Sequence, residues 1–257
     1  MAKTILITGS TSGIGLATAK VFAGKGYNVI FNGLEQNGAE IAASVASEFG
    51  VEHLFSPANL LQPEAIREMV AEACRKFGVI DVLVNNAGIQ YVSPIENFPE
   101  GKWDDIVAII LSAGFHLSKA VWPKMKEQNF GRIINLASAH GLIASPYKSA
   151  YVSAKHGILG LTKTLALEGA AFGITVNAVC PGYVLTPIVE KQIPDQMKVH
   201  NMSREEVIKN VMLKEQAVKD FISAESVAET VFFLADGPAS AYITGIALPI
   251  DGGWSAH

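Results

Sequence analysis

A tyrosine and a lysine in one predicted helix are the residues of this chain best suited to chemistry. Tyr151 and Lys155 lie four residues apart, which places both side chains on one helical face. A phenol is a weak acid, with a pKa of about 10, and a nearby ammonium favours the phenolate. Ser138 follows the strand-like run 132–137, at a strand end of the kind where α/β sheets bind ligands. These three side chains are candidates for acid–base chemistry at this edge of the sheet, although a Tyr and Lys pair at this spacing is also common by chance.

A glycine-rich segment, residues 8–15, follows the first strand-like run and opens a helix. Its glycines allow a tight turn, close approach of the backbone to a pyrophosphate, and close packing of helix on strand. Free N–H groups at the start of the helix then favour phosphate binding. We therefore predict a dinucleotide site here. Its predicted residues are Gly9, Thr11, Ser12, Gly13, Ile14 and Gly15.

The end of the second strand-like run bears on the choice of cofactor. Gly33 stands where an acidic residue usually binds the ribose, and Glu35 comes two residues beyond that position. We expect Glu35 to lie too late in the chain for this role. Positions 33–36 hold no Arg or Lys that could neutralise a 2′-phosphate, and Ser12 is also uncharged. The sequence therefore favours NAD over NADP.

The elements that must position these residues alternate along the chain. Strand-like runs occupy 4–8, 29–32, 52–57, 82–85, 132–137, 175–180 and 246–250, and helical patterns include 13–23, 38–49, 63–77 and 150–172. Apolar strands separated by helices predict a parallel sheet covered on both faces. We expect one α/β domain over 1–257, a doubly wound Rossmann-like fold with seven parallel strands. The longer polar segment at about 186–223 predicts a helical substrate lid, with a plain surface hairpin as the alternative.

Composition limits the classes of partner and compartment. About 49% of the 257 residues are hydrophobic, enough for one large core, and the net charge of −4 argues against nucleic acid or an anionic membrane surface. We find no apolar run of about 20 residues and no signal peptide before the first strand. Cys74 and Cys180 lack metal-ligand spacing and are expected to be reduced thiols. We expect a cytoplasmic protein without a metal site.

Taken together, the motifs resemble the short-chain dehydrogenase/reductase family over essentially the whole chain. The resemblance rests on residues 8–15, Asn85-Asn86-Ala87-Gly88, Ser138, Tyr151, Lys155 and Pro181-Gly182, in that order. It implies hydride transfer with a nicotinamide cofactor, in which the protein supplies orientation and proton handling. Family members are commonly tetramers, so the resemblance also implies a homotetramer.

The resemblance assigns roles to individual residues. Tyr151 is implied as the acid–base group, Lys155 as the group that lowers its pKa and holds the ribose, and Ser138 as the group that polarises the carbonyl. Asn86, Ala87 and Gly88 are implied to support the sheet and border the adenosine ribose. The remaining implied cofactor residues are Leu34, Asn59 and Leu60 near the adenosine, and Pro181, Gly182, Val184 and Thr186 near the nicotinamide.

Two positions depart from the family pattern. Asn59 stands where an Asp usually contacts the adenine, and an amide can still accept that hydrogen bond. Ile110 stands where an Asn usually completes a catalytic tetrad and helps keep a helix locally irregular. We expect a regular helix at Ile110 and a proton path from Tyr151 through Lys155 that is poorly relayed to solvent. On this basis, Ile110→Asn is expected to raise kcat and to leave the KM for NAD nearly unchanged. The alternative is that neighbouring residues have repacked around Ile110, in which case a buried Asn would be unsatisfied and destabilising.

Several segments resemble one subgroup, the D-3-hydroxybutyrate dehydrogenases. They are 88–90, 138–141, 145–149, 186–192 and the closing 251–254. In that subgroup the residues matching Gln90, His140, Lys148 and Gln192 hold the substrate carboxylate, beside Ser138 and Tyr151. One cation with several neutral donors can fix a small acid by charge-assisted hydrogen bonds. Tyr183 stands where the subgroup usually carries Trp and is expected to form a wall at the methyl end of the substrate.

Three functions follow as candidates. The first is NAD-dependent oxidation of (R)-3-hydroxybutyrate to acetoacetate. The second is reduction of a 3-oxoacyl thioester or another ketone, for which a carboxylate site would have no use. The third is a catalytically weakened nucleotide-binding protein, motivated by Ile110 and opposed by the presence of Ser138, Tyr151 and Lys155.

Overall fold

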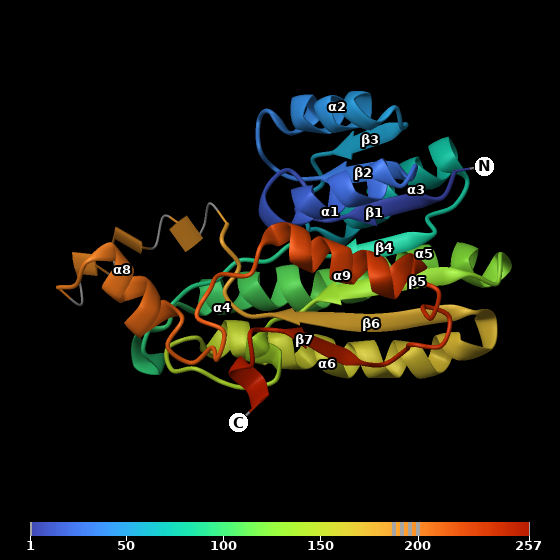
Figure 1. Ribbon diagram of the computed structural model, residues 1–257. Coiled ribbons are helices and arrows are strands. Elements are labelled where there is room, and N and C mark those ends of the chain that lie inside the picture. The colour runs from blue at the N-terminus through green and yellow to red at the C-terminus, as the bar shows by residue number, and fades with distance from the viewer. Residues whose placement is uncertain (1, 187–188, 191–192, 195–196, 199–200, 257) are drawn as a thin grey trace.

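A single parallel sheet organises the protein. The computed structural model describes residues 2–186, 189–190, 193–194, 197–198 and 201–256. Within them the seven-stranded sheet has the order β3-β2-β1-β4-β5-β6-β7, and every neighbouring pair is parallel (Figure 1). The strands are β1 Thr4–Ile7, β2 Asn28–Asn32, β3 His53–Ser56, β4 Val82–Asn85, β5 Gly131–Leu136, β6 Ile174–Pro181 and β7 Ala247–Ile250. The predicted sheet is confirmed, with each strand beginning and ending within one residue of its predicted bounds.

Helices cover both faces of this sheet, because successive strand residues point to opposite sides. Ile5 and Ile7 pack with α1, α2 and α9 on one face, whereas Leu6 packs with α3 and α5 on the other. All three side chains are fully buried. The helices are α1 Gly13–Gly24, α2 Gly38–Phe49, α3 Pro63–Phe77, α4 Glu100–Val107, α5 Ala113–Glu127, α6 Ser149–Gly169, α8 Arg204–Val207 and α9 Ala224–Asp236.

The strand order reverses between β1 and β4, and this creates the crevice in which α/β sheets bind ligands. Asn86, directly after β4, spans the crevice floor. Its side-chain amide donates to the carbonyl oxygens of Thr8 (2.8 Å) and Gly9 (3.0 Å). The Thr8 hydroxyl in turn accepts the backbone N–H groups of Asn86 and Ala87. These bonds fix the glycine-rich turn against the segment that follows β4.

Close packing inside that turn explains its glycines. A Cβ at Gly15 would lie 2.1 Å from the Gly9 carbonyl oxygen, so α1 can approach β1 only without a side chain there. Gly9 and Gly13 both adopt positive φ, at 60° and 53°, which glycine tolerates without strain. The predicted strand–turn–helix unit is therefore present.

The segment between β6 and α9 is helical in part, as its composition predicts. Ser203 and Glu206 form a capping box at the start of α8, and a π-helical turn at Ile208–Met212 follows. Val207 and Met212 pack with Ile193 in a small cluster separate from the main core. The segment carrying α8 projects from the body of the molecule (Figure 1). The segment returns to the body at Ile222, which is paired with the chain after β6.

One continuous helix, from Glu100 to Glu127, is long and apolar enough to span a membrane by length and composition alone. The sequence had led us to expect no apolar run of this length, so that expectation is wrong for this helix. In the fold this helix packs on α3 and α6 through buried residues such as Ile106 and Leu117. About 39% of the most apolar stretch of this helix is buried inside the protein, and that part contributes to the core of the domain.

The turn geometry predicts opposite effects for two Gly→Ala substitutions. Gly15→Ala forces a Cβ into the Gly9 carbonyl, and we expect a loss of about 1–3 kcal/mol of stability. Gly160→Ala, in an exposed part of α6 where an added Cβ meets nothing within 4 Å, should gain about 0.5–1 kcal/mol. Urea unfolding of both variants measures this. Equal stability changes in the two would contradict the packing described for the turn.

Candidate active site

A cleft of about 1260 Å3 lies at the carboxyl ends of the strands and opens into a smaller cavity of about 190 Å3. Most predicted site residues line one or both. The lining includes Gly9, Ser12, Gly13, Ile14, Leu34, Asn59, Leu60, Asn86, Ala87, Gly88, Gln90, Ser138, His140, Lys148, Tyr151, Lys155, Pro181, Gly182, Val184 and Thr186. Thr11 and Gly15 are buried behind this lining. Gln192 lies outside the described residues.

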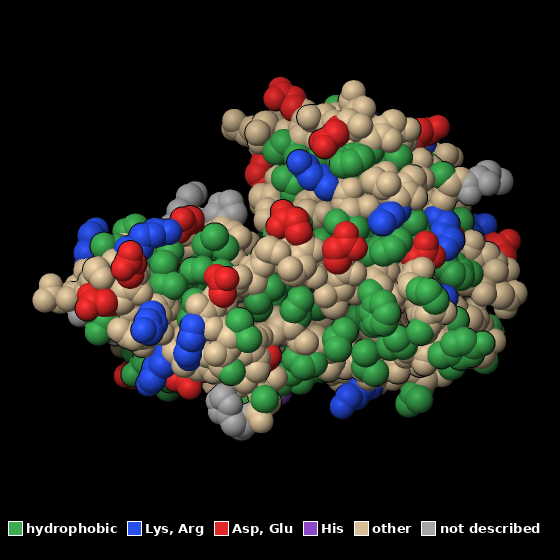
Figure 2. Space-filling view, in the orientation of Figure 1, with side chains coloured by type: hydrophobic (Ala, Val, Ile, Leu, Met, Phe, Trp, Pro, Cys, Tyr) green, Lys and Arg blue, Asp and Glu red, His purple; other side chains and the backbone are tan. Residues whose placement is uncertain are grey.

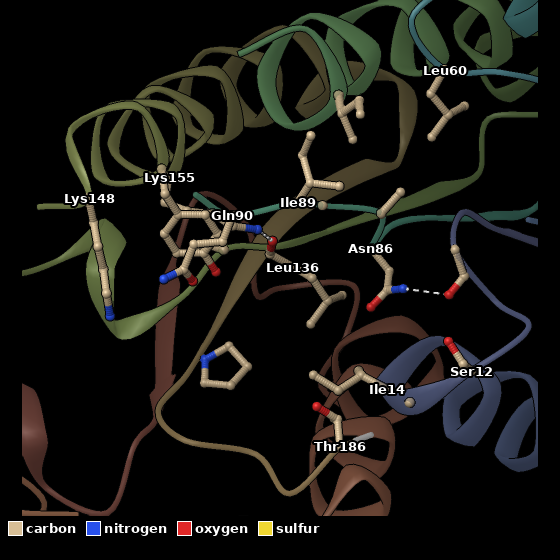
Figure 3. A pocket seen from close by; sticks show the side chains of 18 of the residues that line it. Ser12, Ile14, Leu60, Asn86, Ile89, Gln90, Leu136, Lys148, Lys155 and Thr186 are labelled. Atoms are coloured by element: carbon tan, nitrogen blue, oxygen red, sulfur yellow. Dashed lines mark hydrogen bonds between the residues drawn. The ribbon is translucent and has the colours of Figure 1, made fainter. Parts of the chain in front are cut away.

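Lys155 is a buried cation at the centre of the cleft. Only 4% of the residue is exposed, and its Nζ donates a hydrogen bond to the Leu136 carbonyl oxygen at the end of β5 (Figure 3). Burial lowers the pKa of this lysine to about 8. Nζ also lies 5.5 Å from the centre of the Tyr151 ring, on the preceding turn of α6. The predicted spacing therefore does bring the two side chains together.

Tyr151 and Ser138 meet in the smaller cavity. Burial raises the pKa of the Tyr151 phenol, and a hydrogen bond with the Ser138 hydroxyl acts in the opposite direction. Ser138 is held by its neighbour, because its Oγ accepts the backbone N–H of His140 at 3.1 Å. The arrangement allows one hydroxyl to polarise a substrate oxygen while the other exchanges a proton with it.

His140 lies between the Ser138 and Tyr151 hydroxyls and an aromatic wall. Its ring packs edge-on against Trp254, with ring centres 5.1 Å apart, and Trp254 stacks parallel on Tyr183 at 5.4 Å. The His140 Nε2 lies 2.9 Å from the Ser145 hydroxyl. Burial, followed by the charge of Lys148, lowers the pKa of His140 to about 4. The imidazole is therefore neutral at pH 7 and can donate one hydrogen bond.

Lys148 supplies the cation of the smaller cavity. It stands at the N-terminal boundary of α6, and burial lowers the pKa of its ammonium. Gln90, from the loop after β4, lines the same cavity. Both side chains also line the larger cleft, and Figure 3 shows them extending into that cleft. An ammonium and an amide that face Ser138 and Tyr151 suit a substrate with an anionic group near the reacting oxygen.

The larger part of the cleft fits a dinucleotide. Ser12 precedes α1 without capping it by a side-chain hydrogen bond, and the first turn of α1 carries no acidic residue. The N–H groups there remain available to a pyrophosphate. A Cβ at Gly13 would make only an ordinary van der Waals contact with the Thr186 methyl, at 3.4 Å, so it is the positive φ of this residue that favours glycine. Ile14 and Thr186 face each other across this end of the cleft (Figure 3).

Several residues that line the cleft were not among the predicted site residues, and three of them show why. Leu136 contributes only its carbonyl oxygen, for which a side-chain motif gives no signal. Trp254 belongs to the closing motif noted in the sequence, but only the folded chain brings it against His140. Glu35 also lines the cleft, although its place in the sequence predicts that it lies too late.

Comparisons with known proteins agree with this geometry. A family model described as short chain dehydrogenase matches residues 3–197. The chain belongs to this family. It is 52% identical to the D-beta-hydroxybutyrate dehydrogenase of Rhizobium meliloti (strain 1021), over 100% of both chains. It is 43% identical to the protein of the same name from Cupriavidus necator (strain ATCC 17699), over 99% of this chain and 98% of the relative.

A solved structure is also closely similar. It is the crystal structure of a single-substitution variant of actinorhodin polyketide ketoreductase with NADPH, with a TM-score of 0.92 and 33% identity, covering 100% of this chain and 98% of the other. This likeness confirms the Rossmann-like fold. It also agrees with membership of an oxidoreductase family whose members use a nicotinamide cofactor. It leaves the choice between NAD and NADP open, because that structure holds NADPH.

The backbone around Ile110 differs from the sequence expectation. The chain forms a π-helical turn over Ala108–Ser112, in which the Ala113 N–H donates to the Ala108 carbonyl. The expectation of a regular helix at Ile110 is therefore wrong. The isoleucine is 4% exposed and packs with Ile106 and with residues of α6, including Tyr151. The irregular turn is kept here with an apolar side chain inside it.

This packing argues against the rise in kcat that was expected for Ile110→Asn. An unpartnered buried amide should cost about 1–3 kcal/mol of stability, with kcat unchanged or lowered. Ile110→Val, which removes one methyl group, should cost only about 0.5–1.5 kcal/mol and serves as the matched control. Melting temperature and kcat are measured together. A higher kcat at an unchanged melting temperature would restore the impaired-relay hypothesis.

The depressed pKa of His140 predicts a pH effect on stability. Its folded pKa of about 4 lies below the unfolded value near 6.5, so the unfolded state takes up the proton first as the pH falls. Stability should therefore fall between about pH 6.5 and pH 4. Comparing urea unfolding at pH 7 and pH 5, we expect wild type to lose about 1–2 kcal/mol more than His140→Gln. An equal loss in both proteins would show that His140 does not titrate in this way.

Proposed function

We propose that the protein oxidises (R)-3-hydroxybutyrate to acetoacetate with NAD. One observation carries the proposal: the Lys148 ammonium and the Gln90 amide share a cavity of about 190 Å3 with Ser138 and Tyr151. A four-carbon hydroxy acid has one charge and one reacting hydroxyl, and this cavity has a partner for each. The similarity to two proteins named D-beta-hydroxybutyrate dehydrogenase supports the same substrate.

The proposed reaction removes a hydride from C3 of the substrate and a proton from its hydroxyl oxygen. Bound at the glycine-rich turn, the nicotinamide cofactor would supply the hydride acceptor. Tyr151, as phenolate, takes the hydroxyl proton, and Ser138 donates a hydrogen bond to the oxygen that becomes a carbonyl. The Lys155 ammonium lowers the cost of the phenolate, and burial makes that charge effective because no bulk water screens it.

The carboxylate is held by several donors in this proposal. Lys148 supplies the charge, while Gln90 and neutral His140 supply hydrogen bonds. Gln192, the fourth proposed donor, lies outside the described residues. Tyr183 and Trp254 form an aromatic wall that suits the methyl group. The segment at 186–223 would act as the lid over this cavity.

The proposed enzyme is a cytoplasmic homotetramer. Family resemblance motivates the assembly, and exposed apolar side chains support self-association. On the face seen in Figure 2 hydrophobic side chains gather over α9 and beside it. Exposed apolar residues on α6, on α9 and before β7 are Leu167, Phe233, Tyr242 and Ile246. Contiguous apolar surface of this kind is common at protein interfaces.

Reduction of a 3-oxoacyl thioester or other ketone is the second candidate, favoured by the likeness to a polyketide ketoreductase. The cavity argues against it, because a thioester has no free carboxylate for Lys148. A catalytically weakened nucleotide-binding protein is a third candidate. It is opposed by the close grouping of Ser138, Tyr151 and Lys155.

Tyr151→Phe tests the proton transfer. The substitution removes the phenol oxygen and leaves the ring, so we expect nearly all turnover of 3-hydroxybutyrate to be lost while the Kd for NAD changes little. Single-turnover kinetics and a binding titration measure the two quantities. Substantial remaining turnover would exclude Tyr151 as the proton acceptor.

Lys148→Ala tests the carboxylate site. A charge-assisted hydrogen bond contributes about 1.5–3 kcal/mol, so KM for 3-hydroxybutyrate should rise roughly 10–100-fold. KM for the methyl ester, which has no charge, should change little. Lys163→Ala, at an exposed position of the same helix, is the matched control and should leave both values unchanged. Equal losses on the acid and the ester would refute the assignment.

A further inference from the structure

The turn after β2 folds an acidic side chain back onto a glycine. A Cβ placed at Gly33 would lie 2.6 Å from the Glu35 Oε2 and 2.5 Å from the Thr11 Oγ1. The carboxylate of Glu35 thus lies where a side chain at position 33 would begin. Glu35 comes two residues later in sequence, but the turn returns its charged end to within 2.6 Å of where the Cβ of an acidic residue at position 33 would lie.

Thr11 holds this carboxylate in place. Its hydroxyl donates a hydrogen bond to the Glu35 Oε2, and the residue is only 3% exposed. The Thr11 methyl group lies close to two glycines. A Cβ added at Gly33 would lie 2.8 Å from this methyl carbon, and a Cβ added at Gly38 would lie 3.2 Å from it. Thr11 is part of the glycine-rich turn, so the acidic group is fixed relative to the phosphate-binding segment.

The second oxygen of Glu35 remains available to a ligand. Within the part of the chain that the structure describes, Oε1 has no hydrogen bond and the carboxylate has no ion pair. Gly33, Leu34 and Glu35 all line the larger cleft, and none of them lines the smaller cavity that Tyr151 and Lys148 share. Positions 33–36 contain no cation that could compensate a phosphate.

We propose that Glu35 is the residue that selects NAD over NADP. Its free oxygen accepts a hydrogen bond from the 2′-hydroxyl of the adenosine ribose, and its charge repels a 2′-phosphate at the same place. Gly33 and Thr11 are positioning residues, since one leaves room for the carboxylate and the other holds it. This inference rests on the cofactor class of the proposed function but not on its substrate.

Binding titrations of NAD and NADP, followed by calorimetry, test the proposal without turnover. Glu35→Gln keeps the size of the side chain and removes its charge. We expect the Kd for NAD to rise and that for NADP to fall, so that their ratio changes by about 10–100-fold, the range of one charge-assisted hydrogen bond. Glu40→Gln removes the same charge from an exposed position on α2 and should leave the ratio as in wild type.

Thr11→Val separates positioning from direct contact. It should change the ratio in the same direction but less, and the double variant should match Glu35→Gln, because the two residues act as a unit. A ratio in Glu35→Gln equal to that in Glu40→Gln would overturn the proposal. If wild type fails to oxidise 3-hydroxybutyrate while the ratio changes as expected, the proposed substrate is wrong and this inference stands.

Discussion

A buried ammonium imposes the strongest constraint on this structure. Lys155 is removed from water in the centre of the cleft, and a charge in that position must have compensating partners. Its hydrogen bond to the Leu136 carbonyl ties α6 to the end of β5. Once that contact is made, helical geometry places Tyr151 one turn earlier on the same face, and Ser138 follows Leu136 on the strand side. The relative positions of the three groups therefore follow from one contact.

A buried polar network holds the two elements that make this contact. The Asn85 amide donates to the Asn135 side chain at 2.7 Å, and Asn135 donates to the Thr162 hydroxyl at 2.8 Å. These bonds join β4, β5 and α6 below the active site. Buried polar groups are costly when unpaired, so the network allows little freedom in the register between helix and strands.

Sequence patterns were sufficient to predict the strands of the sheet and most of the residues that line the cleft. Apolar strands and the strand–glycine–helix order are local signals, and β1 with α1 formed as they predict. Contacts that depend on the three-dimensional path of the chain were not predictable in this way. Glu35 returns to Gly33 through a turn, and the π-helical turn at Ala108–Ser112 persists around Ile110. In both places neighbouring elements decide the geometry. The expectation of a regular helix at Ile110 was therefore wrong, while the contact of Glu35 with the ribose is a proposal.

In the proposed function, a free carboxylate beside the reacting hydroxyl defines the substrate. The most direct test is the initial rate of NADH formation by the wild-type protein with (R)-3-hydroxybutyrate, its (S)-enantiomer and a 3-hydroxybutyryl thioester. We expect the (R)-acid to have the highest kcat/KM of the three. A higher kcat/KM with the thioester would exclude the free acid as the preferred substrate and favour a 3-oxoacyl reductase.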